Sequence, residues 1–256
     1  MQISAVIIAF NEEAKIADAI RSVDWADEVL VVDAASTDRT REIAVSLGAR
    51  VIEENWRGFA AQKQFAVDNA AYDWILSIDA DERVSLNLKD EIIEILNFTG
   101  KVADGYRMPR LSTYMGCEIR HSGWYPDWQL RFFDRRKARW KDVAIHESVE
   151  MADGASVGKL NADLLHFSVD SAAQHALMIQ TRYAPLSAQA MLARGTRTSP
   201  LAIALAGPAA FISTYLLKAG FLDGFPGLCI AYFAAYNVFL KHLLLWELQN
   251  GGKSSK

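Results

Sequence analysis

Residues 74–85, WILSIDADERVS, place an apolar run directly before two acids. A short apolar run bounded by polar residues predicts a buried β-strand, here at 74–78. Side chains two positions apart in an extended chain lie on the same face of a strand. We therefore expect Asp79 and Asp81 to point the same way, with like charges close together. Such a pair requires a proton or a cation between its carboxylates.

The segments before this strand alternate between short apolar runs and helical periodicity. Apolar runs predict strands at 3–10, 29–32 and 51–53, and helices are expected between them and after residue 87. Asn11 is the expected N-cap of the first helix, and Ser36 or Thr37 that of the second. This alternation predicts an α/β fold, with a parallel sheet covered by helices on both faces.

In such a sheet, ligands bind at the carboxyl ends of the strands. Polar residues follow three of the predicted strands: Asn11 and Glu12, Asp33, and the pair Asp79 and Asp81. We expect them to converge on one crevice. The loop after the first strand, AFNEEA, has no glycine, and the chain has no Walker loop, so a metal and side chains must hold the phosphates of any nucleotide.

The second half of the chain changes character. Short strands are expected at 105–110, 129–133, 139–141, 147–151 and 164–168, followed by helices at 171–193, 200–217 and 225–246. No Asp, Glu, Lys or Arg lies within 200–217 or 224–240. A spanning helix needs about 20 apolar residues, so a helical hairpin that lies on or dips into a membrane fits better than two spans. The alternatives are an interface between copies of the chain or a core helix layer.

Composition narrows the function classes. The net charge of −4 argues against a nucleic-acid partner. Basic residues nevertheless gather between 107 and 141, which indicates a small anionic ligand or, alternatively, a solvated face. Cys117 and Cys229 have no zinc or disulfide spacing, which favours free thiols in a reducing compartment. The first residues read as a strand and not as a signal peptide, so we expect the active part in the cytoplasm.

Several segments carry a family resemblance. IIAFNEE (7–13), VVDAASTDRT (31–40), GFAAQKQFA (58–66) and SIDADE (77–82) resemble family 2 glycosyltransferases with the GT-A fold, whose DxD motif the last segment matches. DWQLRFF (127–133), AIHES (144–148) and GFLDGFPG (220–227) are similar to the bacterial lipopolysaccharide-core glucosyltransferase branch. One departure is Ala34-Ala35 in place of the usual Asp-Gly, which leaves only Asp33 for a contact with the base.

The resemblance implies an inverting, metal-dependent enzyme. It would move a hexose, glucose from UDP-glucose, to a lipopolysaccharide inner-core sugar or another lipid-linked glycan, with Mg²⁺ or Mn²⁺ as cofactor. The alternatives are a different cell-envelope acceptor, a nucleotidyltransferase of similar fold, or an inactive membrane scaffold. A nucleotidyltransferase needs a glycine-rich basic loop after the first strand, where this chain has AFNEE.

The resemblance also assigns residues on the nucleotide side. Asp33 would accept a hydrogen bond from the uracil N–H, and its alternative is a helix cap shared with Ser36. Phe10, Asn11 and Glu12 would lie near the base or ribose, although Glu12 also suits the first turn of a helix. Lys63 would point at the nucleotide, and its alternative is a solvated helix lysine.

The remaining assignments concern the metal, the diphosphate and the proton. Asp81 would bind the metal, Asp79 would contact ribose, a metal-bound water or the metal, and His146 would be a third ligand or a phosphate donor. Arg131 would hold the diphosphate. An inverting transfer needs a base for the acceptor hydroxyl. Asp127 and Glu147 are the candidates, and Asp127 is preferred because the arginine that follows it also matches.

The predicted domains are a GT-A catalytic domain at 1–170, a helical membrane-associating extension at 171–250 and a flexible tail at 251–256. Within the first, 1–100 would bind the nucleotide and 101–170 the acceptor. The expected location is the cytoplasmic face of the inner membrane, with Lys218 and Lys241 meeting lipid headgroups. The helices within 200–248 would contact the membrane or join two copies of the chain.

Overall fold

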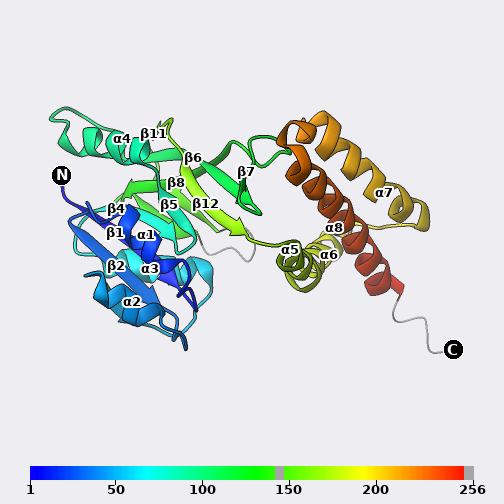
Figure 1. The fold of residues 1–256 in the computed structure, drawn as a ribbon, viewed down its shortest axis with the longest axis horizontal. Coiled ribbons are helices and arrows are strands. Elements are labelled where there is room, and N and C mark those ends of the chain that lie inside the picture. Colours follow the sequence, from blue (N-terminus) through cyan, green and yellow to red (C-terminus); the bar gives the residue numbers. More distant parts are fainter. Residues whose placement is uncertain (142–146, 251–256) are drawn as a thin grey trace. The chain divides into compact units, whose positions relative to one another are not determined.

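The computed structural model describes residues 1–141 and 147–250, which form two compact units. The first unit comprises Met1–Arg110 and Asp127–His166, and contains most of the sheet. The second comprises Leu111–Pro126 and Phe167–Lys256, and is mainly helical. Figure 1 shows the elements of both.

The sheet is mixed. The strands are β1 (Ile3–Ala9), β2 (Glu28–Asp33), β3 (Arg50–Glu53), β4 (Trp74–Asp79), β5 (Glu82–Val84), β6 (Gly105–Tyr114), β7 (Cys117–Glu118), β8 (Asp127–Asp134), β9 (Ala138–Lys141), β10 (Ser148–Met151), β11 (Val157–Lys159) and β12 (Leu164–Val169). Their order in the main sheet is β3-β2-β1-β4-β8-β6-β12-β5. The first four strands are parallel, as predicted, whereas β8 runs antiparallel to β4 and to β6.

Alternate residues of β1 belong to two hydrophobic clusters. Ile3, Ala5 and Ile7 pack with α1 (Ile16–Ser22), α2 (Thr40–Ser46) and α4 (Leu86–Asn97). Val6 packs with residues of α3 (Phe59–Asp68) in the other cluster. Because successive side chains of a strand point to opposite faces, this division confirms that helices cover both faces of the sheet.

The carboxyl ends of the parallel strands meet as predicted. In the strand register, Ala9 pairs with Asp33 and Ile8 pairs with Asp79, so two of the expected acids flank the end of β1.

The predicted helix caps are wrong. Asn11 adopts a left-handed backbone with φ of 54°, and its side-chain oxygen accepts a hydrogen bond from Thr37 N at 2.8 Å. Ser36 Oγ accepts one from Asn11 N at 2.8 Å. The helices begin later, at Ile16 and Thr40. A helix cap would accept a hydrogen bond from the backbone of its own helix. Asn11 and Ser36 instead accept hydrogen bonds from each other's loops, and so link the loop after β1 to the loop after β2.

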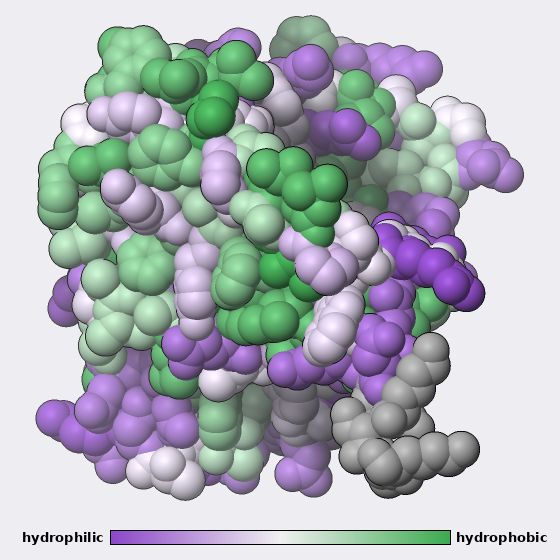
Figure 2. All heavy atoms as spheres, turned by 90° about the vertical axis from the view of Figure 1, so that its right-hand side faces the viewer, coloured by the Kyte–Doolittle hydropathy of each residue, from purple (hydrophilic) through white to green (hydrophobic). Residues whose placement is uncertain are grey.

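The second unit contains α5 (Ala172–Met178), α6 (Ala184–Ala193), α7 (Pro200–Ile212) and α8 (Gly224–Asn250), the π-helical turns η1 (Ile179–Tyr183) and η2 (Ser213–Leu217), and the 3₁₀ turn η3 (Gly220–Asp223). Among the described residues, Pro200–Leu217 and Gly220–Asn250 are long and apolar enough to cross a membrane, and few of their residues are buried. Large exposed apolar side chains are frequent here, among them Leu201, Leu217 and Phe225. Hydrophobic residues accordingly occupy much of the face in Figure 2.

Two glycines let the backbone of η3 approach the start of α8. A Cβ atom built on Gly227 would lie 1.9 Å from the carbonyl oxygen of Gly220. No side chain fits at that distance, so the segment GFLDGFPG requires glycine at position 227.

We expect Gly227→Ala to destabilise the second unit. Displacing backbone to fit the added methyl group should lower the free energy of unfolding by about 1–3 kcal/mol, measurable as a lower midpoint of thermal unfolding. Gly207→Ala is the matched control, because its Cβ would lie at an ordinary 3.4 Å from the carbonyl oxygen of Ala235. Equal midpoints for the two variants would contradict the close-contact explanation.

Candidate active site

Asp79 ends β4 and is paired with two cations from other elements. Its Oδ1 lies 2.8 Å from Nζ of Lys63 on α3, and its Oδ2 accepts a hydrogen bond from Nη2 of Arg131 on β8 at 2.9 Å. Lys63 and Arg131 are 2% and 3% exposed, so both charges are buried beside this carboxylate. The cation that the sequence requires at Asp79 is therefore supplied by the protein itself.

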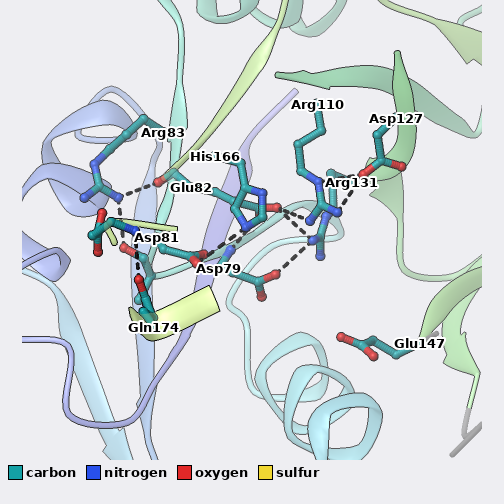
Figure 3. A network of polar contacts seen from close by, with 12 residues as sticks. Asp79, Asp81, Glu82, Arg83, Arg110, Asp127, Arg131, Glu147, His166 and Gln174 are labelled. Carbon is teal, nitrogen blue, oxygen red and sulfur yellow. Dashed lines mark hydrogen bonds and ion pairs between the residues drawn. The ribbon is translucent and has the colours of Figure 1, made fainter. Parts of the chain in front are cut away.

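Glu82 joins the same network from β5. It is fully buried, and its Oε1 accepts hydrogen bonds at 3.0 Å from Arg110 on β6 and from Arg131. Its Oε2 accepts one from Asp79 N at 2.9 Å. Glu82 thus holds two arginines and the end of β4 in place (Figure 3).

These contacts fix the charge states of the two central groups. Burial would raise the pKa of Asp79, but the charges of Lys63 and Arg131 outweigh it and hold the pKa well below its usual range. Burial likewise lowers the pKa of Arg131, and the charges of Glu82 and Asp79 more than reverse this. Asp79 is therefore ionised and Arg131 charged throughout the physiological pH range.

Asp81 turns to a different partner from Asp79. Its Oδ2 lies 3.5 Å from Nε2 of His166 on β12. The prediction that Asp79 and Asp81 share a face is wrong, because β4 ends at Asp79 and residues 80 and 81 form a turn before β5. Figure 3 shows His166 beside Asp81 and Arg131 beside Asp79.

His166 is the site residue that sequence reasoning missed. It lies within an otherwise largely apolar strand, and its register pairs it with Glu82, one residue after Asp81. The isolated histidine of LLHFSV is the only sequence signal for it. That histidine can be assigned to the site only once the pairing of β12 with β5 is known. The predicted ligand His146 lies outside the described residues.

Arg83 braces the turn that carries Asp81. Its Nη1 donates to the carbonyl oxygens of Ala80 and Glu82, both at 2.8 Å, and its Nη2 donates to that of Lys15 at 2.6 Å. Arg83 is 9% exposed, and burial lowers the pKa of its guanidinium, opposed by the nearby acids Asp18, Asp81 and Glu12. Arg83 therefore attaches the 80–82 turn to the segment before α1.

The two predicted base candidates lie at different places in the network. Asp127 begins β8; its Oδ2 accepts from Arg110 at 2.6 Å and its Oδ1 from Gln129 at 2.7 Å. Its side chain is 37% exposed. Glu147 lies near the Lys63 ammonium, with Oε1 3.5 Å from Nζ. Both carboxylates thus belong to the cluster that includes Asp79.

The predicted nucleotide-side residues lie at the ends of β1 and β2. Asp33 is fully buried; its Oδ2 accepts from Ser36 N at 2.8 Å, and no described residue donates to its buried Oδ1. Glu12 has a raised pKa, caused first by burial and then by the charge of Asp81. Phe10 and Asn11 are exposed beside it.

The donor set suits a divalent cation with help from a ligand. No group of three or more His, Cys, Asp or Glu side chains suitable for a metal occurs within residues 1–141 and 147–250. Asp81 and His166 are two donors of the kinds that Mn²⁺ accepts, and their 3.5 Å separation suits binding to one ion. Phosphate oxygens and water would complete the coordination, as is usual for Mg²⁺ sites that bind phosphates.

We expect Glu82→Ala to destabilise the first unit. Removing this carboxylate leaves Arg110 and Arg131 with one partner fewer in a buried place, which should cost about 3 kcal/mol in the free energy of unfolding. Denaturant unfolding measures the loss. Glu42→Ala is the control, because its pair with Arg39 is largely exposed and should contribute little. A loss no larger than that of the control would contradict a supporting role for Glu82.

Comparison with known proteins identifies the family. The family model for glycosyl transferase family 2 matches residues 4–114. An uncharacterized glycosyltransferase of Rickettsia typhi is 34% identical over 96% of this chain and 87% of its own length. The lipopolysaccharide core biosynthesis glycosyltransferase LpsC of Rhizobium meliloti is 27% identical over 95% of this chain and 94% of its own. The chain belongs to glycosyltransferase family 2 and is a glycosyltransferase.

The fold agrees with this assignment. The mannosyltransferase PcManGT from Pyrobaculum calidifontis, solved with GDP-Man and Mn²⁺, aligns with a TM-score of 0.53 at 16% identity, over 99% of this chain and 88% of that one. The likeness confirms the predicted GT-A fold, although the sheet is mixed and not wholly parallel. The predicted long apolar helices lie at the C-terminal end.

Proposed function

We propose that the protein is an inverting, metal-dependent glycosyltransferase that moves a hexose from a nucleotide donor to a lipid-linked glycan. The observation that carries this proposal is the buried cluster of Asp79, Glu82 and Arg131 beside the pair Asp81 and His166. The cluster sets cationic donors next to a pair of metal-type ligands, and a transferred nucleotide diphosphate needs both.

Asp81 and His166 would hold Mg²⁺ or Mn²⁺. When bound, the cation neutralises charge on the leaving diphosphate. The role of Asp79 is then electrostatic, since its carboxylate is already engaged by Lys63 and Arg131. PcManGT contains Mn²⁺ together with a nucleotide sugar, which supports a metal in this enzyme too.

Arg131 is the proposed diphosphate donor. Its Nη2 binds Asp79 and Glu82, whereas its buried Nε and Nη1 have no hydrogen-bond partner in the described part of the chain. Two unused donors of a rigid, charged guanidinium suit phosphate oxygens. Asp33, with its unused buried Oδ1, is the proposed acceptor for the base N–H, and UDP-glucose is the proposed donor.

Asp127 is the proposed base. Arg110 and Gln129 hold its carboxylate in one orientation while part of it stays exposed, so an acceptor hydroxyl can reach it. The hydroxyl loses its proton to Asp127 as its oxygen attacks the anomeric carbon, opposite the leaving diphosphate. Glu147 is the alternative base, since it contacts the same cluster through Lys63.

The proposed acceptor is a lipid-linked glycan such as the lipopolysaccharide inner core. LpsC, which this chain resembles over nearly its whole length, is named for lipopolysaccharide core biosynthesis. The apolar helices α7 and α8 would bind the cytoplasmic face of the inner membrane, where such an acceptor is found. An interface between copies of the chain is the alternative use of these helices. Residues 1–170 would then form the catalytic domain and 171–250 the membrane-associating extension.

A panel of nucleotide sugars tests the proposal. Purified protein is incubated with lipid-linked acceptor, each donor and Mn²⁺, and release of the nucleotide diphosphate is measured. We expect release from one UDP-hexose, full loss on chelation with EDTA, and recovery when Mn²⁺ is restored. Activity that persists in EDTA would overturn the metal requirement. If no combination of donor and acceptor releases the nucleotide diphosphate, the proposed reaction is overturned.

A further inference from the structure

The second unit contains a cavity of about 270 Å³ that the transfer reaction does not use. Residues of the 122–124 loop, α5, η1, η2 and α8 line it, so it lies wholly within this unit. Its apolar lining includes Ile179, Ile230 and Phe233, and Lys218 is the only charged side chain in that lining. This combination suits a ligand with one anionic group and an adjoining apolar part.

Two unusual turns border the cavity. The π-helical turn η1 contributes Ile179 and Tyr183 to the lining, and the π-helical turn η2 contributes Thr214. Lys218 directly follows η2. π-Helical turns are rare and occur frequently at functional sites. Their presence at one cavity is an observation independent of its volume.

Asn237 presents an unsatisfied acceptor in the lining. Its Oδ1 is buried, and no donor in the described part of the chain reaches it. Asn237 lies in the charge-free part of α8, where a polar side chain costs free energy unless it is paired. A hydroxyl group of a ligand would provide the missing hydrogen bond.

Lys218 presents an unpaired cation. None of the ion pairs among the described residues involves its ammonium group, and its side chain lies over Gly123, where a Cβ would be 2.6 Å from Lys218 Cδ. Its carbonyl accepts from Ser122 N at 2.9 Å, which ties the loop to the end of η2. The nearby acid Asp223 is engaged elsewhere, because it accepts from the backbone N–H groups of Arg120 and His121 and from Ser122 Oγ.

His175 adds a neutral ring to the lining. It is 8% exposed, and burial lowers its pKa to about 4, so it carries no charge at neutral pH. Its Nδ1 lies 3.3 Å from the hydroxyl of Tyr114. Lys218 therefore remains the one charge that the cavity offers to a ligand.

We propose that this cavity binds the headgroup of an anionic glycerophospholipid, with the phosphate at Lys218 and a headgroup hydroxyl at Asn237 Oδ1. A membrane source is favoured because Lys218 directly follows the apolar segment Pro200–Leu217, the place where a basic residue meets headgroups. The inference deepens the proposed membrane association and rests on it. It adds a specific lipid site to a general apolar surface.

The test uses the full chain in a neutral detergent, with short-chain phosphatidylglycerol and phosphatidylcholine titrated separately by calorimetry. We expect phosphatidylglycerol to bind at least about fivefold more tightly than phosphatidylcholine, the effect of one lysine near a headgroup. Lys218→Met should abolish this preference, and Lys218→Arg should retain it. Asn237→Leu should weaken phosphatidylglycerol about threefold or more, as expected for one lost hydrogen bond.

Lys101→Met is the matched control, because Lys101 is an exposed lysine of the first unit and lies outside the cavity lining. Equal affinities for the two lipids, or an equal loss in Lys218→Met and Lys101→Met, would overturn the site. Competition by free glycerol phosphate as strong as that by the lipid would overturn the lipid assignment. Thermal unfolding confirms that each variant is folded.

Failure of the broader proposal gives a different result. Sedimentation with vesicles of either lipid tests membrane association, and release of the nucleotide diphosphate tests transfer, whereas the detergent titration measures headgroup preference alone. Absence of vesicle binding with the lipid preference intact would contradict membrane association and leave the cavity assignment standing. Vesicle binding without any preference for phosphatidylglycerol would overturn the cavity assignment only.

Discussion

Asp81→Ala should reduce the rate of nucleotide diphosphate release by about a thousandfold or more. Loss of the carboxylate removes one of the two proposed protein ligands of the metal, and the cation contributes several kcal/mol to stabilising the leaving group, with about 1.4 kcal/mol for each tenfold in rate. Asp79 cannot substitute, because Lys63 and Arg131 already engage its carboxylate. Initial rates over a range of Mn²⁺ concentrations measure the effect.

His166→Ala and Asp68→Ala are the companions of this variant. His166 contacts Asp81, so its loss should raise the Mn²⁺ concentration needed for half-maximal rate. Asp68 is an exposed acid of α3, and its loss should change neither the rate nor the metal requirement. A rate for Asp81→Ala within tenfold of the parent protein would rule out Asp81 as a principal metal ligand.

Asp127→Asn should lower kcat by about 10²–10⁴-fold with little change in KM for the donor. The asparagine keeps the size of the side chain and a hydrogen bond to Arg110, but it cannot accept the proton of the acceptor hydroxyl. Steady-state rates over a range of donor concentrations separate kcat from KM and provide the measurement.

Glu147→Gln distinguishes the two base candidates. Glu147 lies 3.5 Å from Lys63 Nζ, so we expect the glutamine variant to raise KM for the donor modestly and to change kcat by less than about tenfold. The reverse pattern, with kcat lost in Glu147→Gln and kept in Asp127→Asn, would assign the base to Glu147.

Local patterns in the sequence were sufficient to predict the nucleotide half of the sheet. Hydrophobic runs and helical periodicity depend on neighbouring residues, and the parallel order of β1 to β4 follows from their alternation. The meeting of Asp33 and Asp79 at one sheet edge follows from that order alone.

The partners of those acids could not be predicted in the same way. Arg110 and Arg131 reach Glu82 because β8 returns antiparallel beside β4 and β6 pairs antiparallel with β8, and His166 reaches Asp81 because β12 pairs with β5. Such pairings join residues far apart in the chain, and no local pattern specifies them. The same reason explains the wrong caps, since Asn11 and Ser36 take partners in each other's loops.

The self-neutralised cluster around Asp79 has a practical consequence for handling the enzyme. Because Lys63, Arg110 and Arg131 already balance much of the acidic charge at the site, the fold does not depend on a cation to relieve repulsion there. Preparations stripped of metal during purification should therefore keep the fold of the first unit on storage. The metal can then be chosen at the time of assay, which makes it straightforward to compare Mg²⁺, Mn²⁺ and other ions on a single batch of protein.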